Sequence, residues 1–188
     1  MQFLIYGSRE FAHTVAELVE DCGHVVAGFI DDFSSGPRIV GTLEQARCSH
    51  PPDQYRIALA VGYNRLEARW DAWQRLRAAG YQAPALVHPR AYVAKSAEVG
   101  EGAMIMAGAL VDVRARVGAI VVAWPGACIS HDCIVGENSF ISPNATLCGY
   151  VNLGAQCFVG AGAAIVDHCS VPPSTRIKMQ SSYLNTPA

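Results

Sequence analysis

Apolar and small residues recur every six positions along the second half of the chain. Counted in steps of six from Val87 to Ile177, fifteen of sixteen positions are Val, Ile or Leu, and the exception is Ala123. The position two residues earlier holds only Ala, Val, Cys, Ser or Thr from Ala91 to Thr175. A period of six fits neither an α-helix nor an alternating strand, but it is typical of hexapeptide repeats. The pattern therefore predicts a parallel β-helix.

Three hexads would form one triangular coil, so residues eighteen apart in the sequence would stack. We expect the aliphatic positions to line the interior, where each buried side chain contributes roughly 1.5–3 kcal/mol. The small residues would let the chain turn each corner without crowding, and several cysteines fall among them as filler. Five glycines are expected to supply unusual backbone dihedrals at turns: Gly100, Gly118, Gly136, Gly154 and Gly160.

The first part of the chain follows a different pattern, in which candidate strands alternate with candidate helices. Strands are predicted at 3–7, 25–32, 56–62 and 83–87, and helices at 11–23, from 42 onward, and at 64–79. This alternation predicts a parallel sheet with right-handed crossovers. We therefore expect two domains, a Rossmann-like α/β domain at 1–87 and a β-helix at 88–188.

Composition narrows the function classes. Apolar residues make up 51% of the chain and charged residues 16%, which argues for an ordered, globular protein. The net charge is −2 and no long basic run occurs, so we expect neither a nucleic-acid partner nor a membrane-binding face. The seven cysteines are an odd number without a CxxC motif. Reduced thiols in a cytoplasmic protein fit this usage better than disulfides.

One dipeptide interrupts the repeats with a different chemistry. In "ISHDCIVGENSFISPNATLCG", residues 129–149, His131 and Asp132 stand between aliphatic and small residues. His131 follows the inward-facing Ile129 by two positions, so we expect its side chain on an outer face. An imidazole with a pKa near neutrality suits proton transfer, which typically accelerates a reaction 10²–10⁴-fold. Alternatively, His131 and Asp132 are solvent-exposed polar residues at a corner of the coil without a catalytic role.

The unbroken hexads, the "SHD" segment and the preceding "LVHPRAYVAKSAEVG" resemble the left-handed β-helix acyltransferases. The segments "IYGSREFA", "GFIDD" and "AVGYN" are similar to the sugar-binding strand ends of one branch of that family. That branch is the bacillosamine N-acetyltransferase and sialic acid O-acetyltransferase type. The resemblance implies a homotrimer with active sites between neighbouring prisms. It also implies acetyl-CoA as the donor, and a sugar, typically nucleotide-linked, of bacterial surface glycan biosynthesis as the acceptor.

The resemblance also implies roles for single residues of the β-helix. His131 would act as the general base, and Asp132 would orient it and favour its protonated form. The backbone N–H of Gly149 would donate to the oxyanion. The coenzyme site would also include Phe140, Ala161 and Gly162. The acceptor would attack the thioester directly, without a covalent enzyme intermediate.

The first domain offers a second candidate site where three strands end. Carboxyl ends of parallel strands meet at one edge of a sheet, which is where ligands bind in such folds. A phosphate would be favoured where "GSREF" opens a helix, and a single glycine there does not make a dinucleotide fingerprint. The residues expected to bind the acceptor are Gly7, Ser8, Arg9, Asp31, Asp32, Gly62 and Asn64.

Departures from the family pattern leave alternatives open. Trp124 and Phe140 make the expected pocket more apolar than in many relatives, and the segment 175–188 replaces a Gly-x-Pro-Ala stretch that lies along CoA in them. A catalytically inactive sugar-binding or scaffold protein therefore remains an alternative. N- and O-acylation are both open.

A zinc hydratase on the same fold needs three histidines, and the repeats beyond His88 contain only two, so we expect no metal.

Overall fold

The structure is a computed structural model that describes residues 1–184. The chain forms two compact units, one spanning Met1–Leu86 and the other beginning at Val87. The last four residues of the segment 175–188, which stands in place of the family's Gly-x-Pro-Ala stretch, lie outside the described residues.

The N-terminal unit combines four strands with three helices and one short 3-10 turn. Its elements in chain order are β1 (Gln2–Tyr6), α1 (Glu10–Asp21), β2 (Val25–Ile30), β3 (Ile39–Gly41), α2 (Leu43–Ser49), β4 (Tyr55–Leu59), η1 (Tyr63–Arg65) and α3 (Leu66–Ala78).

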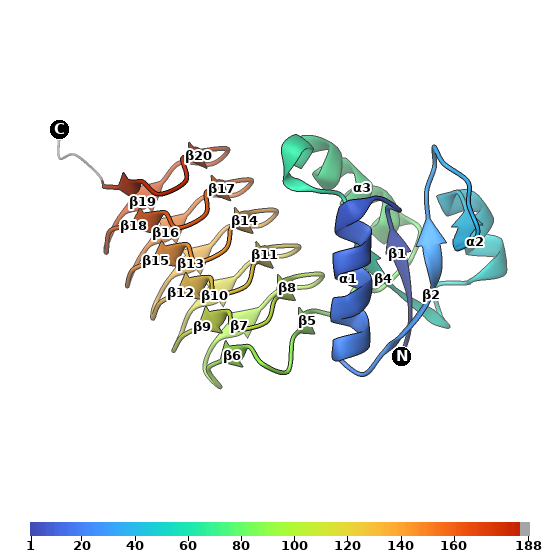
Figure 1. The fold of residues 1–188 in the computed structure, drawn as a ribbon, viewed down its shortest axis with the longest axis horizontal. Coiled ribbons are helices and arrows are strands. Elements are labelled where there is room, and N and C mark those ends of the chain that lie inside the picture. Colours follow the sequence, from blue (N-terminus) through green and yellow to red (C-terminus); the bar gives the residue numbers. More distant parts are fainter. Residues whose placement is uncertain (185–188) are drawn as a thin grey trace. The chain divides into compact units, whose positions relative to one another are not determined.

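All strands of this unit run parallel, in the order β3-β2-β1-β4. Four of the five residues of β1 and the last three residues of β2 and β4 are buried, as expected for strands covered on both faces. Helices α1 and α3 lie on opposite sides of the sheet (Figure 1). Because the strands are parallel, the carboxyl ends of β1, β2 and β4 meet at one edge of the sheet.

Local signals predicted most elements of this unit, with two errors. Thr42 caps α2 and forms a capping box with Gln45, as the sequence indicates. The short strand β3 was not predicted. Of the strand predicted at 83–87, only β5 (Leu86–Val87) is formed, and its assignment to this sheet is wrong because β5 pairs with β8. The strand β3 has only three residues, which is too short for a periodic pattern to reveal it. The strand β5 has two residues, and their sequence does not indicate which strand they pair with.

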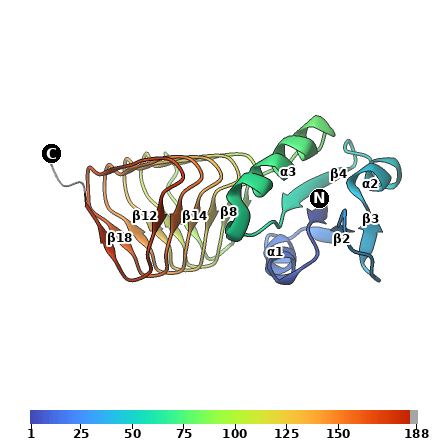
Figure 2. The ribbon, with the colours of Figure 1, turned by 90° about the horizontal axis from the view of Figure 1, so that it is seen from above.

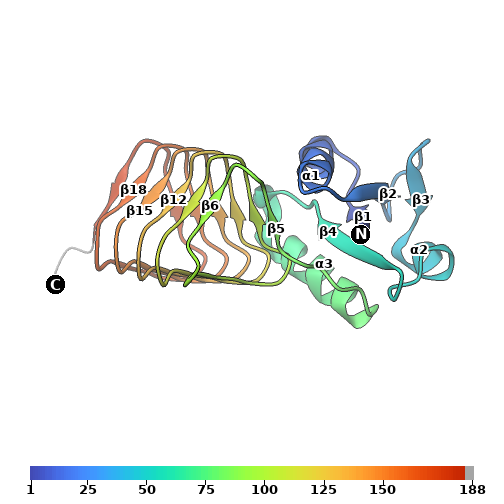
Figure 3. The same cartoon turned by 90° about the horizontal axis from the view of Figure 1, so that it is seen from below.

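The second unit is a parallel β-solenoid with three faces (Figures 2 and 3). The first face contains β7 (Glu98–Val99), β10 (Arg116–Val117), β13 (Ile134–Val135), β16 (Asn152–Leu153) and β19 (Ser170–Val171). The second contains β5, β8 (Met104–Ile105), β11 (Val122–Ala123), β14 (Phe140–Ile141), β17 (Phe158–Val159) and β20 (Arg176–Ile177). The third contains β6 (Tyr92–Val93), β9 (Leu110–Val111), β12 (Cys128–Ile129), β15 (Thr146–Leu147), β18 (Ala164–Ile165) and β21 (Ser182–Tyr183).

Paired residues on neighbouring turns are eighteen positions apart. Val117 pairs with Val99 on one side and with Val135 on the other, and the same offset recurs on every face. The second residue of each strand points inward, and together with the small corner residues these side chains form one continuous core. The prediction of three hexads per coil is therefore confirmed.

The corners differ from the sequence prediction in which residues adopt the left-handed backbone conformation. Within residues 1–184, ten residues other than glycine have positive φ, among them Asp132 at 59° and Asn144 at 56°. The five glycines expected to supply unusual dihedrals do not have positive φ. They are needed because the next turn passes too close: a Cβ on Gly118 would lie 2.7 Å from the backbone nitrogen of Glu137. That expectation was wrong because close approach, not φ, selects glycine there.

Replacing Leu153 by Ala should lower the free energy of unfolding by about 2–5 kcal/mol, because the removed atoms leave a cavity in the core. Its side chain is fully buried, whereas the neighbouring Asn152 points outward and is exposed. Urea unfolding of Leu153→Ala and of the matched Asn152→Ala would measure the difference. Equal losses in the two variants would contradict the assignment of the inner face.

Candidate active site

His131 and Asp132 lie at the corner between β12 and β13. We call residues 130–133 and their equivalents eighteen positions away the His131 corner. The flanking residues Ile129 and Cys133 are buried in the core and hold this corner in place. The side chains of His131 and Asp132 point outward, with 45% and 18% of their surface exposed. The imidazole is therefore accessible from outside the coil.

Asp132 joins His131 to a guanidinium on the preceding turn. Nε and Nη2 of Arg114 donate to its two carboxylate oxygens at 2.7 and 2.8 Å, and Oδ2 also lies 2.9 Å from Nδ1 of His131. The hydrogen bonds from Arg114, and then the one from His131, lower the pKa of Asp132 to about 2. The carboxylate therefore stays ionised at neutral pH. As a pure acceptor, it favours the tautomer of His131 that carries a proton on Nδ1 and a lone pair on Nε2.

Gly149 provides the space that the imidazole occupies. It lies one turn further along the His131 corner, and a Cβ there would be 2.6 Å from Cε1 and 2.7 Å from Nε2 of His131. The ring therefore rests against the backbone of Gly149. Within residues 1–184, no group accepts a hydrogen bond from the Gly149 N–H. A backbone donor and the lone pair of an imidazole are thus close together and open to a ligand.

Two aromatic side chains continue the His131 corner over the next turns. The ring of Tyr150 meets that of His131 edge-on, with centroids 5.3 Å apart, and stacks on His168 at 4.7 Å. Arg114, Asp132, Tyr150 and His168 are spaced by eighteen residues, and all four have φ between 56° and 62°. Sequence reasoning missed Arg114 and Tyr150 and gave His168 no role. The eighteen-residue period was the signal that could have found them.

The other residues predicted for the coenzyme site lie elsewhere on the coil. Phe140 belongs to β14 on the second face, and none of its surface is exposed. Ala161 and Gly162 form the corner that follows β17, where Gly162 has a φ of 65°. The structure therefore brings His131, Asp132 and Gly149 together. It does not bring Phe140, Ala161 and Gly162 to the same corner. Their coenzyme role stays a prediction.

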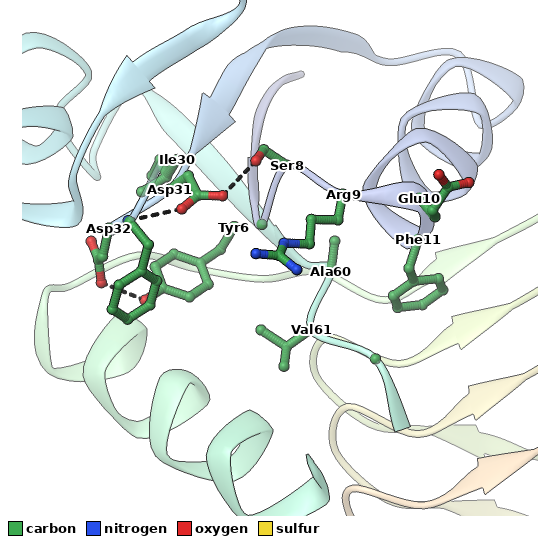
Figure 4. Close-up of a pocket in the computed structure, with 13 residues that line it drawn as sticks. Tyr6, Ser8, Arg9, Glu10, Phe11, Ile30, Asp31, Asp32, Ala60 and Val61 are labelled. Carbon is green, nitrogen blue, oxygen red and sulfur yellow. Dashed lines mark hydrogen bonds between the residues drawn. The ribbon is translucent and has the colours of Figure 1, made fainter. Parts of the chain in front are cut away.

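A cavity of about 380 Å³ opens at the carboxyl ends of β1, β2 and β4 in the N-terminal unit (Figure 4). Asn64 does not line it, but lies exposed in η1. The cavity lining includes the other six residues predicted to bind the acceptor, which are Gly7, Ser8, Arg9, Asp31, Asp32 and Gly62. The structure therefore gathers residues from three separate segments around one concave surface.

Gly7 makes the turn from β1 into α1 possible. Its φ is 116°, and a Cβ there would lie 2.9 Å from the carbonyl oxygen of Ala60. Any other residue would therefore strain the backbone or push β1 and β4 apart. The side chain of Arg9 reaches from the end of this turn into the cavity toward Tyr6 (Figure 4).

Asp31 is held by donors from both sides of the cavity. The hydroxyl of Ser8 donates to Oδ2, and the backbone N–H groups of Phe33 and Ser34 donate to Oδ1 at 2.9 and 3.0 Å. Burial alone would raise the pKa of Asp31, but these hydrogen bonds and the nearby charge of Arg9 outweigh it and lower the pKa. Asp31 is therefore an ionised acceptor beside a cationic side chain.

Asp32 has a different environment from its neighbour. Its oxygens accept from the hydroxyl of Tyr6 at 2.6 Å, from Nη2 of Arg75 at 2.8 Å and from the N–H of Leu43 at 2.9 Å. Burial raises the pKa of Tyr6 to about 12, and the hydrogen bond to Asp32 adds to this shift. Burial alone would also raise the pKa of Asp32, but its donors lower it. Asp32 thus ties β1, α2 and α3 together at the cavity.

Phe33 lines the same cavity with 94% of its surface exposed, and sequence reasoning missed it. An aromatic residue directly after "DD" at a strand end was the signal for it.

In the described part of the chain, no three His, Cys, Asp or Glu side chains gather as metal ligands would. None of the helices within residues 1–184 is long and apolar enough to cross a bilayer.

Comparison with known proteins supplies the chemical context of these two regions. No family model matches the chain. The chain is 22% identical over 162 residues to a GDP-perosamine N-acetyltransferase of Escherichia coli O157:H7, which covers 85% of this chain and 73% of that protein.

Among solved structures, the acetyltransferase domain of PglB from Neisseria gonorrhoeae superposes with a TM-score of 0.90 and 28% identity, over 97% of this chain and 91% of that one. PerB from Caulobacter crescentus, solved with CoA and GDP-perosamine, superposes with a TM-score of 0.88 and 27% identity, over 98% and 89% of the two chains. The predicted resemblance to the hexapeptide-repeat sugar acetyltransferases is confirmed.

Replacing Gly149 by Ala should displace the imidazole of His131, because the new Cβ would overlap Cε1 and Nε2. We expect a crystal structure of the variant to show a changed side-chain rotamer of His131, loss of its contact with Asp132 and an unchanged solenoid backbone. Gly62→Ala is the control, since a Cβ there meets nothing within 4 Å. An imidazole that keeps its position in Gly149→Ala would show that the described packing is wrong.

Proposed function

We propose that this chain transfers the acetyl group of acetyl-CoA to an amino group of a nucleotide-linked sugar, with His131 as the general base. The observation that carries the proposal is the juxtaposition of the Nε2 lone pair of His131 with the open N–H of Gly149. Similarity to a GDP-perosamine N-acetyltransferase supports the acceptor class. Similarity to a domain solved with acetyl coenzyme A, at 28% identity and a TM-score of 0.88, supports the donor.

The residues of the His131 corner fit the chemistry of this transfer. Acetyl-CoA supplies the acetyl group as a thioester, whose C–S bond breaks as the sugar nitrogen forms a C–N bond to the carbonyl carbon. Nε2 of His131 accepts the proton that the attacking nitrogen loses, and the proton is then available to the departing thiolate. Asp132 stabilises the imidazolium formed in between. The N–H of Gly149 donates to the oxyanion that develops on the carbonyl oxygen.

Direct attack by the acceptor is supported by the state of the nearest buried thiol. Cys133 follows Asp132 in the sequence, but its side chain points into the core. Burial raises the pKa of the Cys133 thiol to about 11, so it is not a thiolate at neutral pH. Burial also raises the pKa of Cys148, the thiol on the next turn of this corner. The corner therefore offers a base rather than a thiolate nucleophile, which agrees with a reaction without an acyl-enzyme.

The N-terminal unit would act as a Rossmann-like domain that binds the nucleotide of the acceptor. Arg9 and the amides at the start of α1 form a site suited to a phosphate group. The ionised Asp31 is placed to accept a hydrogen bond from a ribose hydroxyl, and Phe33 presents an exposed ring for stacking on a base. In this proposal Gly62 and Asn64 border the sugar, while Asp32 supports the site by holding Tyr6 and Arg75.

The solenoid would be left-handed and would assemble as a homotrimer, with each His131 corner facing a neighbouring subunit. The third face supports this assembly, because its outward side chains carry no charge. These are Tyr92, Leu110, Cys128, Thr146, Ala164 and Ser182. All seven cysteines are free thiols, which fits an enzyme that works in the cytoplasm as part of bacterial surface glycan synthesis.

Replacing His131 by Ala should lower kcat about 10²–10⁴-fold, because the attacking amine loses its proton acceptor. Release of free CoA thiol from acetyl-CoA would be followed with GDP- and UDP-linked amino and hydroxy sugars. His13→Ala, which removes an exposed imidazole from α1, is the matched control and should retain the wild-type rate. Turnover of hydroxy sugars alone would make the enzyme an O-acetyltransferase. No turnover with any acceptor would favour an inactive binding or scaffold protein.

Replacing Arg9 by Ala should raise the KM for the nucleotide sugar about tenfold, because a charge-assisted hydrogen bond to phosphate is lost. The kcat and the KM for acetyl-CoA should change less than twofold. Initial rates at varied acceptor concentration would measure the effect, with Arg47→Ala on the exposed side of α2 as the control. A rise in the KM for acetyl-CoA instead would place the nucleotide outside this cavity.

A further inference from the structure

Arg114 lies on the turn before His131 and grips Asp132 with two parallel hydrogen bonds of 2.7 and 2.8 Å. A planar guanidinium that binds both oxygens of one carboxylate fixes the position and the plane of that carboxylate. We propose that Arg114 is a positioning residue that orients the imidazole of His131 for proton transfer by holding Asp132. The proposal rests on the proposed function of His131 as the general base.

The geometry explains why such a grip is needed. Asp132 is adjacent to His131 in the sequence and lies at an outer corner, where no core packing restrains its side chain. Its Oδ2 atom is shared, since it accepts from Nη2 of Arg114 and lies 2.9 Å from Nδ1 of His131. If the carboxylate rotated, Nδ1 would lose its acceptor and the two neutral tautomers of the ring would mix. Arg114 therefore keeps the lone pair on Nε2.

A second group that contacts the imidazole lies on the turn after His131. The ring of Tyr150 meets that of His131 edge-on, with an interplanar angle of 87°. The charge of Arg114, two turns before Tyr150, acts on the Tyr150 hydroxyl. Arg114 therefore lies near both groups that contact the imidazole, and its two hydrogen bonds hold one of them, Asp132.

The exposure of Arg114 separates this role from a structural one. Its side chain is 62% exposed, and ion pairs at such positions contribute little to stability. Loss of Arg114 should therefore leave the unfolding transition almost unchanged while it lowers catalysis. Lys at this position would keep the charge but could not form the two parallel bonds, so charge and geometry can be tested separately.

The kinetic test compares Arg114→Gln and Arg114→Lys with the matched control Arg116→Gln. The control removes an exposed arginine from β10, outside the His131 corner. We expect kcat to fall about tenfold or more in both Arg114 variants, with both KM values within twofold of wild type. Arg116→Gln should match wild type. A kcat within twofold of wild type in both Arg114 variants would overturn the proposal.

Nitrogen NMR of the His131 ring provides a readout that does not require turnover. We expect the wild type at high pH to show one tautomer, with the proton on Nδ1, and Arg114→Gln to show a mixture of the two. If the wild type lacks turnover but the tautomer responds in this way, the proposed function fails while the positioning role stands. If the wild type is active and His131 is essential, but neither the tautomer nor kcat changes when Arg114 is replaced, the positioning role alone is wrong.

Discussion

The hydrogen bonds between successive turns of the solenoid set the positions of the described residues in the second unit. These bonds pair residues eighteen positions apart on neighbouring turns, as Val117 pairs with Val135. A shift by one residue would turn the inner column outward on all faces, so the buried Val, Ile and Leu side chains fix this register. Residues at one corner of successive turns therefore form a straight ladder.

The candidate active site is built on that ladder rather than along the chain. Arg114, Asp132 and Tyr150 come from three different turns, and Gly149 supplies both the space for His131 and an open N–H beside it. No loop or helix is needed to bring these groups together. The same backbone that buries the core also holds His131 and Asp132, so the geometry of the candidate site and the stability of the fold share one cause.

The sequence was most informative where a pattern repeats and least where contacts cross turns. The period of six predicted the solenoid and its core, and Thr42 predicted the start of α2. The short β3 and the pairing of β5 escaped because two or three residues carry no periodicity. Glycines such as Gly118 were explained by the wrong cause, since the proximity of the next turn is visible only in three dimensions.

The same distinction holds for the candidate sites. His131 and Asp132 stand out along the chain, and the family resemblance pointed to Gly149, whereas Arg114 and Tyr150 become meaningful only when residues are read in steps of eighteen. The two neighbouring aspartates of the N-terminal cavity look alike in the sequence. Only the structure shows that Asp32 is occupied by Tyr6, Arg75 and Leu43, while Asp31 lies beside Arg9.

The ladder also limits how the gene for this protein can change in length. Duplication of one complete coil of eighteen codons after His168 would add a turn and leave the neighbours from Arg114 to His168 in place. The same duplication inserted between Arg114 and Asp132 would separate the guanidinium from its carboxylate by an extra layer. The far end of the prism is thus free to grow or shrink over evolutionary time, while the coils from 114 to 150 must be inherited as a block.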